Sequence, residues 1–402
     1  MFSTSGPDGN EQLLGKKQRI LLESVTVLYF IAKNSAVPLL QQYVYHLVDL
    51  KHNYTGQRHA ILEQNVTKPT KQDLDYLHTV AENVNREGSE IVLYLNIAEL
   101  LPSAIIVLLL GCYSDYIGKR KFLMWLPCLG NAFLSLGYIL PLYITGGNID
   151  HPATKTLLVL ASIVSGLSGN LPAFLSGNAS YISDTDTVKR RTLRLAIVEC
   201  IIGVTFGVAN FANGFWINAT NSFEQPLWFI FVCSLVPLFL IIFMLKEPSG
   251  ELTYELTKPV LTGWRNIKGI RHLFTLDTVK HKKLWAIFWA FQVYIFVQQG
   301  QERTFVLFLQ NSPLFWRAIK IGCFFLVLYG LSGLGSWPGV PLLQRFTSDV
   351  AITILAIVSK AMGSFIMAFA TDDFTVFLCE YSLFYALLRF FKCTNFVVSY
   401  KI

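Results

Sequence analysis

Charged residues are scarce in this chain. They make up 15% of its 402 residues, whereas hydrophobic residues make up 53%. Soluble domains carry about 25% charged residues. The apolar residues recur in runs of about 20, which is the length that an α-helix needs to cross a bilayer. This composition excludes a soluble globular domain and predicts an all-α membrane protein that crosses the bilayer many times.

Signals for catalysis, metal binding and secretion are also lacking. The seven cysteines all fall in or beside apolar runs, so neither a disulfide framework nor a zinc spacing is visible. No nucleophile–base set and no phosphate-binding loop is present. We therefore expect no enzyme, no metal and no cofactor. The polar stretch 1–19 lacks the apolar core of a cleavable signal peptide, so the first span is expected to direct insertion.

Apolar periodicity predicts about ten membrane spans. They cover residues 20–47, 91–112, 122–145, 156–182, 195–217, 227–245, 284–299, 321–343, 350–370 and 374–398. Lys and Arg gather before the first span and after the second, fourth and sixth. The positive-inside rule places these loops and the N-terminus in the cytoplasm. The net charge of +7 therefore sets orientation, and we expect no nucleic-acid partner.

Glycosylation sequences agree with this orientation. The loop after the first span falls on the outer side and holds acceptors at Asn53 and Asn65. A third acceptor, at Asn218, lies in a later outer loop. Asn178 matches the same pattern but lies inside a predicted span, so we expect no glycan there.

The predicted spans fall into two groups. Residues 1–246 are expected to form a six-helix bundle with a glycosylated outer loop at 48–90. Residues 247–283 then form a cytoplasmic linker, and residues 284–402 an incomplete second bundle that is two spans short. A fragment, a splice form, a faulty gene prediction and a genuinely shortened protein are all compatible with the sequence.

The loop between the second and third spans carries the most specific motif. From residue 111 to residue 121 it reads G-x-x-x-D-x-x-G-[KR]-[KR]-[KR]. Gly111 and Gly118 favour close helix approach and a tight turn. Asp115 is placed to accept hydrogen bonds from a helix end or to pair with an Arg, and Lys119 and Arg120 hold the turn at the cytoplasmic leaflet. An ordinary positive-inside loop is the alternative interpretation.

This motif resembles the corresponding loop of major facilitator transporters, and other stretches resemble one family of solute carriers more closely. They are L-E-S-V-T-V-L at 22–28, S-G-L-S-G-N at 165–170 with A-S-Y-I-S-D at 179–184, R-T-L-R-L-A-I-V-E at 191–199, and S-P-L-F-W at 312–316. They resemble the proton-coupled folate transporter family, which includes the thymic stromal cotransporter homologues. The resemblance implies the major facilitator fold and proton-driven transport of organic anions such as folates.

The resemblance also implies roles for single residues. Glu199 stands where the family has the fifth-span glutamate tied to proton coupling. Arg389 matches a tenth-span arginine tied to substrate or proton handling. The chain departs from the family before the seventh-span glycine, where V-Q-Q-G-Q-E-R at 297–303 lacks the family's histidine. The family's outer-loop cysteine is absent as well.

Ionisable residues inside the spans are further candidates, because a charge at the bilayer centre is costly unless it faces a cavity, a partner or a substrate. Asn96 and Glu99 share one face of the second span and either line a cavity or bond a neighbouring helix. Lys33 and Lys360 are candidate cations for an anionic substrate. In the alternative, Lys33 pairs with Glu99 or Glu199.

Glu199 and Arg389 also have alternative structural roles. Glu199 either carries the coupling proton or serves as a partner of Arg194 or Lys33. Arg389 either holds a substrate carboxylate or anchors the span at the interface.

The sequence thus predicts a secondary transporter that works by alternating access. It would carry a small organic anion together with protons across a plasma or endolysosomal membrane. Asp115 and its basic neighbours would act as a conformational lock on the cytoplasmic side. The alternative from another class is a non-transporting membrane protein that acts as a receptor, a partner or an inactive isoform.

Overall fold

The computed structural model describes residues 15–53, 71–186, 188–220 and 222–247. Further on it describes 285, 289, 292–293, 296–297, 323–324, 326–329, 358, 361–369 and 376. Within these ranges every regular element is helical, and six helical segments are long and apolar enough to cross a membrane. The prediction of an all-α membrane protein is confirmed for this part of the chain.

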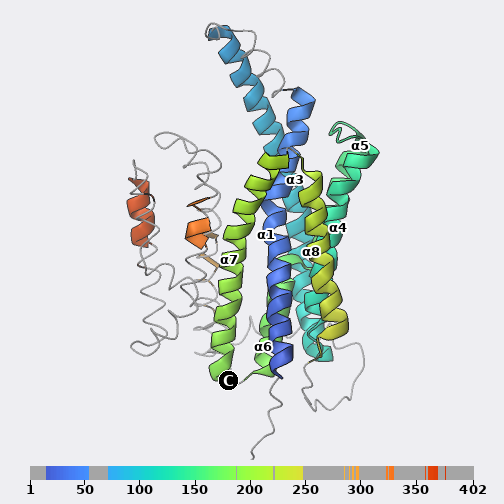
Figure 1. Cartoon of the computed structure of the whole chain (residues 1–402), viewed down its shortest axis with the longest axis vertical. Helices are drawn as coiled ribbons and strands as arrows, with labels where there is room; N and C mark the ends of the chain where they lie inside the picture. The colour runs from blue at the N-terminus through green and yellow to red at the C-terminus, as the bar shows by residue number, and fades with distance from the viewer. Residues whose placement is uncertain are drawn as a thin grey trace, which may run out of the picture.

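The spans follow one another in alternating directions (Figure 1). The helices are α1 (Lys16–His52), α3 (Lys71–Ile117), α4 (Phe122–Ile144), α5 (Pro152–Leu167), α6 (Asn170–Thr185), α7 (Val188–Thr220) and α8 (Glu224–Phe239), which ends in a π-helical turn (Leu240–Met244). Together α5 and α6 make one span, from residue 152 to residue 185.

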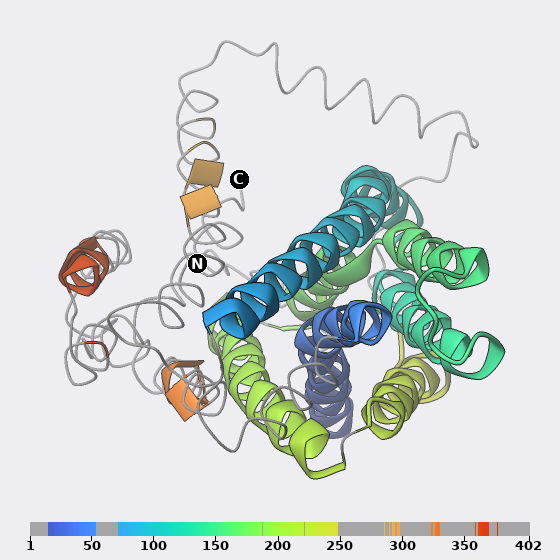
Figure 2. The ribbon, with the colours of Figure 1, turned by 90° about the horizontal axis from the view of Figure 1, so that it is seen from above.

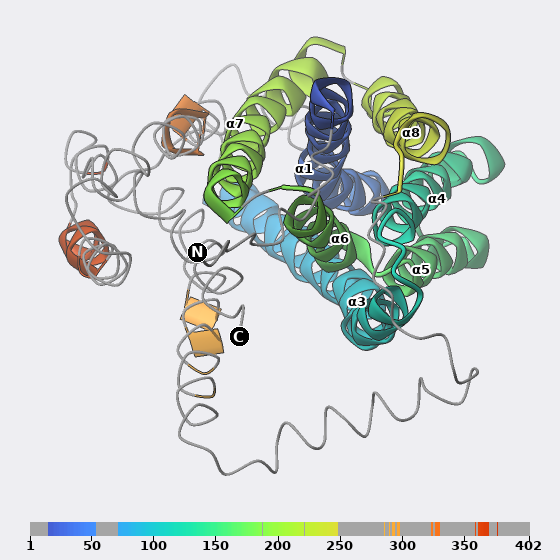
Figure 3. The ribbon, with the colours of Figure 1, turned by 90° about the horizontal axis from the view of Figure 1, so that it is seen from below.

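Helix α1 is the central element. It packs against α3, α4, α7 and α8, and the views from the two ends show these helices around it (Figures 2 and 3). Its apolar side chains join two cores, one toward each end of the bundle. Tyr43 and Leu47 pack with Tyr138 of α4 in one. In the other, Tyr29 stacks on Phe174 of α6 with 3.6 Å between ring centroids.

The basic loops gather at one end of the bundle. Gln18 near the start of α1 forms hydrogen bonds with the backbone of Met244 and Lys246, at the end of the sixth span. Arg19 pairs with Asp186, which precedes α7, at 3.4 Å. The segments that carry the cations therefore share one face, as the positive-inside prediction requires.

Helix α3 begins much earlier than the predicted second span, 91–112. Residues 71–90 belong to the helix, although the sequence predicted an outer loop over 48–90. Apolar periodicity does not report a polar helix outside the membrane. Lys51 and His52 at the end of α1 hold Glu87 of α3, at 2.7 and 2.8 Å. Figure 1 shows the start of α3 and the end of α1 projecting beyond the other spans.

The fourth span, predicted as one helix over 156–182, is broken. Helix α5 ends at Leu167, and Gly169 and Asn170 adopt left-handed φ angles of +83° and +48° before α6 continues. Glycine takes this conformation without strain, which explains the break. Ser103 of α3 donates to the carbonyl of Gly169 at 3.1 Å, so the break is bonded to α3.

A small residue brings α5 close to α3. A Cβ atom placed on Gly166 would overlap the backbone oxygen of Glu99. The approach is therefore closer than any larger residue allows. Lys360, Arg389, Asn65, the linker and most of the second predicted bundle lie outside the described residues.

Candidate functional site

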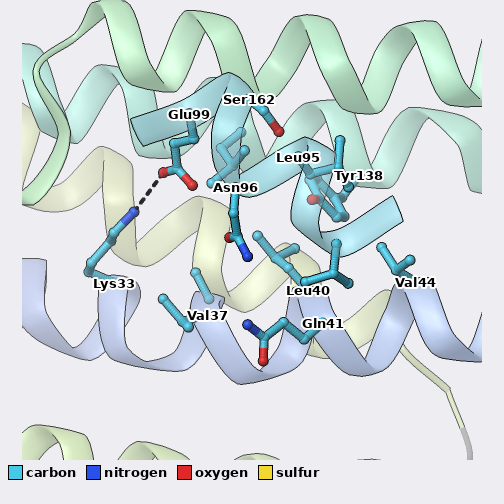
Figure 4. A pocket seen from close by; sticks show the side chains of 13 residues that line it. Lys33, Val37, Leu40, Gln41, Val44, Leu95, Asn96, Glu99, Tyr138 and Ser162 are labelled. Carbon is cyan, nitrogen blue, oxygen red and sulfur yellow. Dashed lines mark hydrogen bonds and ion pairs between the residues drawn. The ribbon is translucent and has the colours of Figure 1, made fainter. Parts of the chain in front are cut away.

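A pocket lies between α1, α3, α4 and α5, lined largely by aliphatic side chains (Figure 4). Its polar lining residues are Lys33, Gln41, Asn96, Glu99, Tyr138 and Ser162. Lys33 and Glu99 fall near the middle of their spans, which run over Lys16–His52 and Glu82–Asp115. The pocket therefore lies near the middle of these candidate membrane spans.

Lys33 and Glu99 form an ion pair in this pocket. The distance from Lys33 Nζ to Glu99 Oε1 is 3.0 Å, and the two side chains are only 8% and 16% exposed. Figure 4 shows the two side chains pointing toward each other from α1 and α3. Of the two partners that the sequence left open for Lys33, the structure shows Glu99.

Two further donors reach the same carboxylate oxygen. Ser165 Oγ of α5 lies 3.0 Å from Glu99 Oε1, and Asn170 Nδ2 of α6 lies 2.7 Å from it. Hydrogen bonds to a charged acceptor are the stronger kind, so these contacts fix the position of the Glu99 side chain. One oxygen thus accepts from three donors on three different helical segments.

The break between α5 and α6 places these donors. It sets Asn170 at the start of α6 and Ser165 in the last turn of α5, on either side of Glu99. The Asn170 side chain is fixed in turn, because its Oδ1 accepts the backbone N–H of Leu171 at 2.8 Å. Discontinuous helices commonly supply the polar groups of transporter sites.

The other sequence candidates take different places. Asn96 lines the pocket one turn before Glu99. Glu199 lies half-buried on α7 and outside the lining of this pocket. Arg194, one of the partners considered for Glu199, pairs with buried Asp186 and, at 3.7 Å, with Glu23.

Sequence reasoning missed Ser165 and Asn170 as members of the site. Both residues belong to the stretch S-G-L-S-G-N, which was noted only for its resemblance to the solute-carrier family. The Ser-Gly pair at 168–169 is a turn signal that was available. A break predicted at this pair would have indicated that the polar side chains before and after it do not share one continuous helical face.

The cytoplasmic loop after α3 forms a second polar cluster. Gly118 turns the chain with φ of +71°, as predicted. Asp115 pairs with Arg120, whose Nε also donates to Asp184 at the end of α6, 2.8 Å away. Burial opposes the charge of Arg120, but the hydrogen bonds to Asp115 and Asp184 outweigh it and raise the pKa of the guanidinium above its usual value. The loop is thus fastened to α6.

The same loop also contacts the residues that follow the sixth span. The backbone N–H groups of Arg120 and Lys121 donate to the carboxylate of Glu247, at 3.3 Å each. Lys119 is exposed, and its carbonyl accepts from Ser114 Oγ at 2.8 Å. Gly111 differs from the expectation, since no described atom lies within 4 Å of where its Cβ would be. Close helix approach is therefore not its role among the described residues.

The glycosylation candidates separate by exposure. Asn53 is exposed at the C-terminal end of α1. Asn178 is buried in α6 and donates to Thr26 Oγ1 of α1 at 2.9 Å, which confirms that its sequon is not a surface acceptor. Among the described residues, no group of three His, Cys, Asp or Glu side chains could hold a metal ion.

Comparison with protein families gives one match that covers most of the chain. The Major Facilitator Superfamily profile matches residues 76–398. The lysosomal proton-coupled steroid conjugate and bile acid symporter SLC46A3 of Gallus gallus is 25% identical over 369 residues, covering 89% of this chain and 76% of that protein. The proton-coupled folate transporter of Bos taurus is 26% identical over 356 residues, covering 86% and 72%.

Solved structures show the same architecture. The human organic anion transporter MFSD10 (TETRAN) superposes with a TM-score of 0.64 over 96% of this chain and 86% of that one, at 14% identity. A D-xylose–proton symporter gives 0.52 over 94% and 80%, also at 14% identity. At this identity the likeness concerns the fold alone.

Proposed function

We propose that this chain, which belongs to the Major Facilitator Superfamily, carries a small organic anion across the membrane together with protons. Membership makes it a multi-pass membrane transporter and not an enzyme. The curated relatives belong to the proton-coupled folate transporter family that the sequence motifs resemble. Anion symport by alternating access is our proposal for this chain.

The observation that carries the proposal is the pocket at mid-bilayer depth with the Lys33 ammonium in its wall. A buried cation beside a cavity can serve as the partner of an anionic solute once its own partner, Glu99, releases it. The remaining lining is mostly aliphatic, with Leu40, Val44 and Leu95 among its members. This combination suits an organic anion that presents both a charged group and an apolar surface.

The names of these relatives support the same class of solute. One describes a symporter of steroid conjugates and bile acids, and another a folate transporter, both proton-coupled. We therefore propose an organic anion of this kind, moved in a plasma or endolysosomal membrane. Arg389 and Lys360 remain proposed contributors from the second half of the chain.

For the proton we retain Glu199 as a proposed coupling residue on the strength of the sequence resemblance. It lies half-buried on α7, and α7 is bonded to α1 beside the ion pair, where Asn34 donates to Thr205 Oγ1 at 3.0 Å. A proton on Glu199 can thus affect the contact between α7 and α1. The cluster around Arg120 is the proposed cytoplasmic lock.

Transport in proteoliposomes tests the proposal. A radiolabelled bile acid, a steroid sulfate and a folate are supplied separately, with and without an inward proton gradient. We expect the gradient to drive accumulation of at least one of them. Glu199→Gln should remove the stimulation by the gradient, whereas Glu90→Gln, an exposed carboxyl of α3, should leave it unchanged. Equal uptake with and without the gradient in the wild-type protein would contradict proton coupling.

A further inference from the structure

The charges in the pocket neutralise each other. Lys33 and Glu99 are its charged lining residues in the part of the chain that the structure describes, and they contact each other directly. An anion that enters the pocket therefore meets an ammonium that already has a carboxylate partner. The internal carboxylate must release Lys33 before a solute anion can take its place.

We infer that Glu99 is the internal counter-anion of Lys33 and that a solute anion replaces it only when a proton neutralises Glu99. This inference rests on the proposed function and deepens it, because it makes proton binding a condition of anion binding. Glu199 retains its proposed effect on the coupled movement of the helices. Glu99 governs whether the anion binds.

Charge balance supports the order of events. With no solute, Lys33 and Glu99 sum to zero. With an anion and a proton both bound, the ammonium, the neutral carboxyl and the anion again sum to zero. An anion alone would leave one negative charge in the pocket, and a proton alone would leave one positive charge. Uncompensated charge at this depth is costly, so both mixed states are disfavoured.

The surroundings of Glu99 can hold the carboxyl in both protonation states. The proton arrives from water, forms an O–H bond on the carboxyl and later leaves to water on the opposite side. Ser165 donates to the carboxylate, and its hydroxyl can rotate to accept from the protonated form. Asn170 donates in either state. These two side chains keep Glu99 in place while the contact with Lys33 is lost.

The other groups that face Glu99 each keep a single charge state at neutral pH. From α1 these are Lys33 and Tyr29, and from α4 Tyr138, whose phenol interacts electrostatically with Glu99, as that of Tyr29 does. From α5 and α6 they are Ser165 and Asn170, which do not titrate. Phenols stay protonated at neutral pH, and an ammonium stays charged.

Ligand-induced thermal stabilisation of the purified full-length protein tests the inference without requiring transport. The probes are the same bile acid, steroid sulfate and folate, at mildly acidic and at neutral pH. For the wild-type protein we expect a probe to bind about tenfold more tightly at a pH one unit lower, because binding that requires one proton changes by up to a factor of ten per pH unit. Glu99→Gln imitates the protonated carboxyl and should bind that probe with similar affinity at both pH values. Lys33→Met should lose binding at both.

Matched variants distinguish the effect of Glu99 on binding from the effects of other carboxyl groups. Glu90→Gln on the same helix and Glu199→Gln on α7 should both keep the pH dependence of binding. If Glu99→Gln keeps that dependence, or if Glu199→Gln alone removes it, the inference is wrong. Binding that follows the expected pattern without transport in proteoliposomes would overturn the proposed function and leave the inference standing. Absence of binding by the wild-type protein to all three probes at either pH would overturn the inference for this class of anion.

A variant that retains the carboxyl covers the case in which Glu99→Gln does not fold. Glu99→Asp shortens the side chain by one methylene and so weakens its hold on Lys33. It should bind the probe more tightly than the wild-type protein at neutral pH and still respond to acid. Affinity equal to wild type at both pH values would contradict the role assigned to Glu99.

Discussion

Gly166 is a residue at which a single methyl group should disturb the site. Its Cα lies so close to α3 that an added Cβ would overlap the backbone oxygen of Glu99. Overpacking of this kind costs about 1–3 kcal/mol. Gly166→Ala should therefore lower the unfolding temperature of the purified protein and weaken probe binding, both measured by thermal unfolding.

Gly111→Ala is the matched control for that prediction. No described atom lies within 4 Å of the added Cβ, and alanine is the better helix former by about 1 kcal/mol. Its unfolding temperature should equal or exceed that of the wild-type protein. If both alanine variants behave alike, the close packing of α5 on α3 is not what holds the site together.

At the residue scale the sequence identified the charged members of the site and left their pairing open. Lys33, Asn96 and Glu99 stood out because ionisable and amide side chains are rare in apolar spans. Which carboxyl meets Lys33 depends on how the helices rotate against one another, and no periodicity reports that rotation. Ser165 and Asn170 were missed because their roles depend on a left-handed turn inside a span.

At the element scale, Arg120 fastens the α3–α4 turn to α6. Its guanidinium contacts Asp115 and Asp184 together, and a lysine ammonium cannot reproduce that fork. If this contact is the cytoplasmic lock, Arg120→Lys should reduce transport of the probe at least several-fold without loss of protein from the membrane. Initial rates in proteoliposomes, normalised to protein content, measure the effect.

Lys119 provides the comparison inside the same basic run. It is exposed, so Lys119→Ala should leave the transport rate near the wild-type value. An equal loss in both variants would indicate that the positive charge of the loop matters and that the specific contacts of Arg120 do not.

Element boundaries could be predicted only where the membrane dictates them. The third span, predicted over 122–145, matches α4 at Phe122–Ile144 within one residue. The helix that contains the second span starts 20 residues before the predicted span, because residues 71–90 of α3 are polar and carry no membrane signal. The fourth was predicted as continuous, because its apolar content does not reveal that Gly169 and Asn170 reverse the sign of φ.

At the scale of the whole molecule, the orientation of the bundle can be tested by glycosylation. Asn53 lies at the end of α1 opposite to the basic loops, and the acceptor at Asn65 follows in the same predicted outer segment. We expect Asn53→Gln and Asn65→Gln each to remove one glycan, seen as a mobility shift that glycosidase treatment abolishes.

Asn178→Gln should produce no such shift, since Asn178 is buried between α6 and α1. Loss of a glycan in that variant would place the α6 segment outside the bilayer. An unglycosylated wild-type protein, produced in a cell that modifies other secretory proteins, would contradict the proposed outer location of both acceptors.

The claim that anion and proton move together is tested most directly by recording both in the same vesicles. Proteoliposomes containing the full-length wild-type protein are loaded with a pH-sensitive dye, and the radiolabelled probe is added outside at equal internal and external pH. Entry of the anion should acidify the interior of wild-type vesicles, whereas vesicles that contain Glu99→Gln should show no such acidification. Anion entry into wild-type vesicles at constant internal pH would contradict this claim.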